Sequence, residues 1–85
     1  MTVTSGGSLN DPLGLTVLPD GNIVTANGDD GFAVETTPSG HQIAKALLDS
    51  SGNPPGAGAL FGLAFVTGQG LYYVDDATNT LNVAH

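Results

Sequence analysis

The amino-acid sequence predicts an all-β fold in which short antiparallel strands form two similar sheets. Two observations support this prediction. Short apolar and β-branched runs alternate with tight-turn sequences along the chain. In addition, one segment aligns with a later segment at a fixed offset, which is the signature of a structural repeat. The 85 residues, 40% of them hydrophobic, are enough for one small globular domain.

The first half of the chain begins with three predicted strands. Residues 14–18 (GLTVL) form a near-continuous apolar run, as expected for a strand buried on both faces. Residues 22–27 (NIVTAN) are rich in β-branched side chains, and residues 32–36 (FAVET) alternate apolar and polar like a half-exposed strand. Pro19-Asp20-Gly21 predicts a tight turn, because Pro presets φ and Gly accepts a positive φ.

A fourth strand is predicted for Gln42 to Asp49, after a turn at Pro38-Ser39-Gly40. A short amphipathic helix is the alternative, because Ile43 and Leu47 are spaced i, i+4 among good helix formers. The repeat favours the strand, since a four-stranded meander needs one more strand here.

The repeat places residues 13–36 over residues 61–84 without gaps, at an offset of 48. The second copy therefore predicts strands at 62–66 (GLAFV), 70–75 (GLYYVD) and 80–84 (TLNVA). Gly31 aligns with Asn79, and both residue types tolerate a positive φ. Four antiparallel strands in every 40–50 residues are typical of the blades of a β-propeller, in which blades pack around a central axis.

The sequence pattern of both copies resembles that of the NHL-repeat family of β-propellers, from about Asp11 to Val83. The residues that carry the resemblance are Pro12 to Gly14, Asp20-Gly21-Asn22, Val74-Asp75 and Asn79. The first copy departs from the pattern, with Ala26-Asn27 in place of Val-Asp, and both copies lack the basic residue that often follows the Asn. The resemblance implies a ring of about six blades and full-length relatives that are extracytoplasmic bacterial proteins. The missing basic residues argue against the RNA-binding face of some relatives.

The chain holds fewer than two complete blades, so we expect either a fragment or a protomer that completes a ring by assembly. The expected division is an N-terminal strand and linker at 1–10, a first blade at 11–52 and a three-stranded second blade at 53–85. Thr2, Val3 and Thr4 are β-prone and could supply the missing fourth strand to a neighbouring chain. Three chains would close six blades and four would close eight. The alternative is a loose N-terminal stub beside a small open sheet.

Composition restricts the partners. Lys45 is the only Lys or Arg, and the formal net charge is -7. This charge argues against nucleic acid and anionic membranes as partners, because both need basic residues to meet phosphates. The chain has no cysteine for disulfides or zinc, no signal-peptide pattern at its start and no apolar run of about 20 residues. The sequence does not identify the compartment.

Two pairs of carboxylates are the candidate ligand residues: Asp29 with Asp30, and Asp75 with Asp76. Clustered oxygens suit Ca²⁺. Structural turns are the favoured interpretation, because Asp in a tight loop accepts hydrogen bonds from its own backbone. No calcium-loop motif is present, and we predict no metal and no cofactor.

The sequence predicts a structural and self-assembly module rather than an enzyme. No serine lies in a GxSxG motif, and the glycine-rich segments lack the lysine of a phosphate loop. The alternative is part of an extracytoplasmic propeller that acts as an enzyme or ligand-binding protein. Relatives of that architecture include lyases and lactonases with a metal in the central channel.

Overall fold

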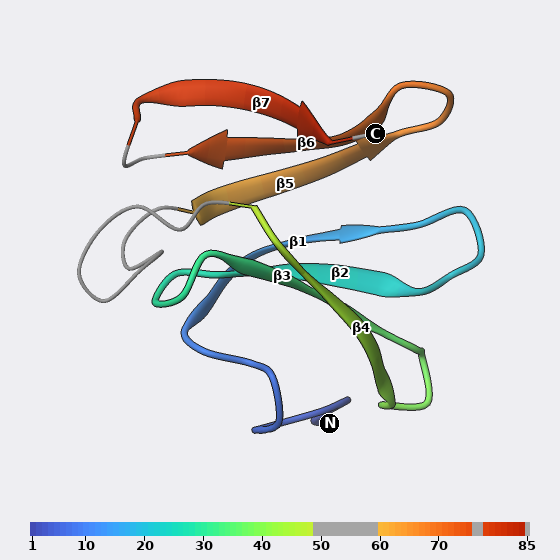
Figure 1. Ribbon diagram of the computed structural model, residues 1–85. Helices are drawn as coiled ribbons and strands as arrows, with labels where there is room; N and C mark the ends of the chain where they lie inside the picture. Colours follow the sequence, from blue (N-terminus) through green and yellow to red (C-terminus); the bar gives the residue numbers. More distant parts are fainter. Residues whose placement is uncertain (49–59, 76–77, 85) are drawn as a thin grey trace.

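The computed structural model describes residues 1–48, 60–75 and 78–84, without the side chain of Phe61. These residues form seven strands in two open antiparallel sheets (Figure 1). The first sheet has the order β1-β2-β3-β4, and the second has the order β5-β6-β7. The strand bounds are β1 Pro12–Val17, β2 Ile23–Asn27, β3 Phe32–Thr36, β4 Gln42–Leu47, β5 Leu60–Val66, β6 Gly70–Asp75 and β7 Thr80–Ala84. The all-β prediction is confirmed. The described residues contain no helix that could cross a membrane.

The segment with two interpretations is a strand. β4 pairs antiparallel with β3, from Phe32 opposite Leu47 to Thr36 opposite Gln42. The helix alternative is therefore wrong. Helix propensity is a weak preference, and a short isolated helix is only marginally stable. Pairing with β3 instead gives the backbone of this segment hydrogen-bond partners in the sheet.

The two sheets are built in the same register, which supports the 48-residue repeat. Leu15 pairs with Thr25 in the first sheet, and Leu63 pairs with Tyr73 at the corresponding place in the second. Ala26 opposite Ala33 corresponds in the same way to Val74 opposite Leu81. Even the irregularity at the start of the first strand recurs, after Pro12 in one sheet and after Leu60 in the other.

The turns repeat as well. The amide of Gly21 donates to the Leu18 carbonyl, and the amide of Gln69 donates to the Val66 carbonyl 48 residues later, both at 2.9 Å. Gly31 has a φ of 74° and Asn79 a φ of 58°, as predicted from their alignment. The turn chemistry of the sequence thus sets the strand spacing in both copies.

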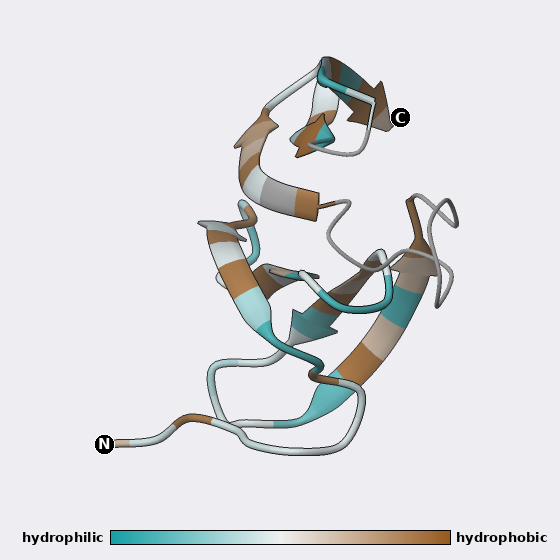
Figure 2. Cartoon of the chain, turned by 90° about the vertical axis from the view of Figure 1, so that its left-hand side faces the viewer, coloured by the Kyte–Doolittle hydropathy of each residue, from teal (hydrophilic) through white to brown (hydrophobic). Residues whose placement is uncertain are grey.

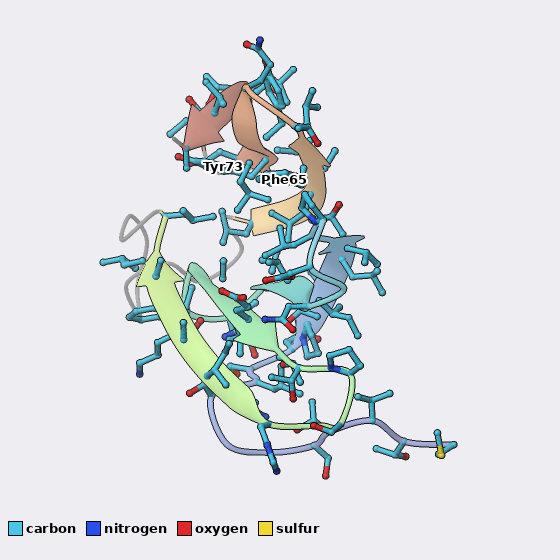
Figure 3. All side chains as sticks on the ribbon, turned by 90° about the vertical axis from the view of Figure 1, so that its right-hand side faces the viewer. Phe65 and Tyr73 are labelled. Carbon is cyan, nitrogen blue, oxygen red and sulfur yellow. The ribbon has the colours of Figure 1, made fainter. Side chains whose placement is uncertain are left out.

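The sheets pack face to face. On the first sheet the facing surface includes Val24, Ala26 and Ala33; on the second it includes Leu63, Phe65, Leu71 and Tyr73. Ala26 and Leu60 form the buried centre, with Leu63 and Tyr73 packed against it. Phe65 and Tyr73 are labelled on the second sheet in Figure 3. A hydrogen bond of 3.0 Å from the Phe65 amide to Thr16 Oγ1 also joins β5 to β1.

The expectation that the first strand is buried on both faces is wrong for the single chain. Leu15 is 63% exposed and Val17 is 56% exposed, because both side chains lie on the side of the first sheet opposite the second sheet. We call this side the outer face of the first sheet. The second sheet has a corresponding outer face, formed by Ala64, Val66, Tyr72, Val74, Leu81 and Val83.

The positive φ of Asn79 makes a paired substitution informative. Asn79→Ala is expected to lower the free energy of unfolding by about 1 kcal/mol, because a Cβ-bearing residue without a local polar group is disfavoured in the left-handed region. Asn79→Gly is expected to match or exceed the wild-type stability. Urea unfolding followed by circular dichroism measures both variants. Equal stability of the Ala and Gly variants would contradict the left-handed conformation of this turn.

Candidate assembly interface

The predicted carboxylates differ in their burial and in their hydrogen bonds. Asp30 lies between β2 and β3, where its Oδ1 accepts from the Phe32 amide at 3.1 Å and its Oδ2 accepts from Asn10 Nδ2 at 3.3 Å. Asp29 in the same turn is exposed. Asp75 ends β6, is buried, and accepts from the Thr78 amide at 3.3 Å. Asp76 lies outside the described residues. These contacts fit the structural interpretation of the acidic pairs.

The acidic pairs do not form a shared site in the described part of the chain. No group of three or more His, Asp or Glu side chains there could hold a metal ion. The first pair lies in a turn of the first sheet, whereas Asp75 lies in a strand of the second. The described acidic residues therefore form no common binding site, and the open surfaces of the sheets are the candidate functional region.

Asn27 is a buried polar residue that the sequence analysis did not single out. It is fully buried at the end of β2. Its Nδ2 donates to the Ser8 carbonyl at 2.9 Å, and its Oδ1 accepts from the Asn10 amide at 3.1 Å. Because Asn27 aligns with Asp75, a polar residue at this place in both copies was the available signal. Asn27 fixes the segment that enters β1 against the end of β2.

The N-terminal residues lie beside their own sheet. Thr2, Val3 and Thr4 belong to no strand, and the Val3 carbonyl lies against Gly40 in the turn between β3 and β4. Gln42 holds the following residues: its Nε2 donates to Thr4 Oγ1 and to the Gly6 carbonyl, both at 3.1 Å, and its Oε1 accepts from the Ser8 amide at 2.7 Å. In Figure 1 this segment runs along the side of the first sheet away from the second.

Both outer faces carry exposed apolar side chains. On the second sheet, Leu81 is 70% exposed and Val74 is 44% exposed. On the first sheet, Leu15 is 63% exposed and Val17 is 56% exposed. Figure 2 shows hydrophobic colouring on strands of both sheets. Exposed apolar side chains on one face of a sheet mark a candidate interaction site.

The edge of the second sheet is also open. β7 pairs only with β6 among the described strands, whereas the corresponding strand β3 pairs with both β2 and β4. A hollow of about 320 Å³ lies between the two sheets and reaches the end of β7 at Ala84. Ala44, Ala46 and Leu48 line it from the first sheet, and Phe65, Leu71 and Ala84 line it from the second. The hollow lies where the first sheet has a fourth strand and the described second sheet has none.

Comparisons of the chain with family models, with curated proteins and with solved structures gave no match.

The buried hydrogen bonds of Asn27 can be tested by truncation. Asn27→Ala is expected to lower the free energy of unfolding by about 2–4 kcal/mol, because it leaves the Ser8 carbonyl and the Asn10 amide without their partner. Asn22→Ala is the matched control. Asn22 donates to Glu35 Oε2 at a half-buried place, so its loss is expected to cost under about 1 kcal/mol. Chemical unfolding of both variants gives the comparison, and equal losses would contradict a special role for Asn27.

Proposed function

We propose that this chain is a self-assembling building block of a closed β-propeller of the NHL type. In this proposal it is a structural and interaction module without catalysis of its own. Its principal partner is a second copy of itself. Three copies complete a six-bladed ring, and four copies would complete an eight-bladed one.

One observation supports the proposal: two sheets of matching register pack face to face and leave exposed apolar side chains on both outer faces, at Leu15 and Val17 of the first sheet and at Val74 and Leu81 of the second. The part of the first outer face at Val34 is already buried within the chain. The outer face of the second sheet is the repeat counterpart of the first-sheet surface that is buried inside the chain. The outer face of the first sheet is likewise the counterpart of the second-sheet surface that packs against the inner face of the first sheet. The contact made within one chain can therefore be repeated between chains.

A contact of this kind is head-to-tail, because the two surfaces that meet are different. Head-to-tail contacts related by rotation close a ring, in which every chain buries both of its outer faces. Burial of apolar area contributes roughly 25 cal/mol per Å², so closure stabilises a chain that is too small to bury much surface alone.

The open edge of β7 fits the same assembly. A fourth strand beside β7 would use the unpaired backbone groups of this edge and cover the adjoining hollow. In the proposed ring, Thr2, Val3 and Thr4 of a neighbouring copy supply this strand. Val3 lies between two threonines, so one apolar side chain can turn toward the hollow while the polar ones face solvent.

The first test is the mass of the chain in solution. Light scattering on a size-exclusion column is expected to give about 25 kDa, three times the 8.5 kDa of one chain. A mass of about 34 kDa would indicate four copies and would keep the proposal of ring closure. A mass of 8.5 kDa at every soluble concentration would overturn it.

The role of the N-terminal strand is tested by replacing Thr2, Val3 and Thr4 together with glycine. This change keeps the chain length and the backbone hydrogen-bonding groups but removes the β-prone side chains. Self-association is expected to weaken by about tenfold or more, which corresponds to ~1.4 kcal/mol. Sedimentation equilibrium measures the change.

Val3→Ile is the control for this substitution, because Ile keeps the β-branched, apolar character of the residue. It is expected to assemble as the wild type does. If the glycine variant assembled as tightly as the control, the N-terminal residues would have no part in the interface.

A further inference from the structure

We infer that Val74 of one copy inserts into a shallow depression on the next copy. Pro12, Leu13, Gly14, Leu15 and Thr25 line this depression on the outer face of the first sheet. The inference rests on the proposed function, and it names the contact through which copies recognise one another.

The repeat identifies the two partners. Four of the residues that line the depression, Pro12, Gly14, Leu15 and Thr25, have Leu60, Gly62, Leu63 and Tyr73 as their counterparts 48 residues later. Inside the chain, Leu60 packs on Ala26, and Leu63 and Tyr73 pack around the pair. The counterpart of Ala26 is Val74. The contact equivalent to the buried centre of the chain is therefore Val74 against the depression.

The sizes of the side chains fit this exchange. Within the chain the small residue, Ala26, comes from the first sheet, and the large residue, Leu60, comes from the second. Between copies, Val74 is larger than Ala26, and Pro12 is smaller than Leu60. The combined volume is thus similar, which is the condition that close-packed interiors tolerate best.

Both surfaces are available in the single chain. Val74 is 44% exposed and lies above Gly62, where its Cγ2 is 3.8 Å from the place that a Cβ on this glycine would take. Leu15 is 63% exposed, so the N-terminal segment that lies along the outer face of the first sheet leaves the depression open. No rearrangement of either sheet is needed before the copies meet.

The contact between copies depends on apolar packing more than the contact within the chain does. Thr16, which accepts a hydrogen bond from the Phe65 amide, corresponds to Ala64, which has no hydroxyl group. The repeated contact therefore lacks this hydrogen bond. A charge placed at Val74 or Leu15 would be buried without a partner, which is strongly unfavourable.

The experiment uses two variants, Val74→Asp and Leu15→Asp, of the full 85-residue chain. Each variant alone is expected to fall from about 25 kDa to 8.5 kDa by light scattering, because one of its two surfaces is blocked. The two variants mixed in equal amounts are expected to form a dimer of about 17 kDa. Val74 of the Leu15→Asp chain can still enter the intact depression of the Val74→Asp chain, whereas the two aspartates face each other at the other junction.

Gln69→Asp is the matched control, because it adds the same charge in the exposed turn between β5 and β6, outside the strands that form the contact. It is expected to assemble as the wild type does, and circular dichroism checks that every variant keeps its strands. If both single variants assembled normally, or if the mixture stayed at 8.5 kDa, this contact would be wrong even though the wild type assembles. A monomeric wild type would overturn both the ring and the contact.

Discussion

The structure depends on one constraint: both faces of each sheet carry apolar side chains, and packing the two sheets together covers only one face of each. On the covered faces, Ala26 and Leu60 pack against each other and are buried. The exposed Leu15 and Leu81 show what remains on the outer faces. The repeat makes the uncovered faces copies of the covered ones, so the solution used inside the chain is also available between chains.

Most of the fold could be predicted from sequence because it is determined locally. Turn residues such as Gly21 and Asn79 require particular backbone conformations, and β-branched runs between them favour strands. The repeat resolved the ambiguity at Gln42–Leu47, where propensity alone favoured neither state strongly. The exposure of β1 could not be predicted in this way. An apolar run is the same in sequence whether its partner belongs to its own chain or to another.

The candidate site was predicted less well, for a related reason. The carboxylates stood out by residue type, yet Asp30 is engaged by its own turn and by Asn10. Asn27 and Gln42 were not singled out, although their side chains hold the N-terminal segment across a long stretch of sequence. Contacts of that length depend on how the elements pack, and no local pattern records them. The position of Asn27 requires both a hydrogen-bond donor and an acceptor, which a side-chain amide supplies and a carboxylate does not.

The described acidic residues lie mainly outside the strands. The chain carries a formal net charge of -7, which opposes association in general. Of the six acidic residues that the structure describes, Asp11, Asp20, Asp29 and Asp30 lie outside the strands, and only Glu35 and Asp75 lie within them. Glu35 belongs to the covered side of the first sheet, where Asn22 donates to it. The exposed apolar rows at Leu15 and Val74 are thus free of acidic side chains, while the turns of the first sheet carry Asp20, Asp29 and Asp30. Such an arrangement repels random encounters but adds no buried carboxylate where one specific pair of faces meets. It fits the proposed head-to-tail contact.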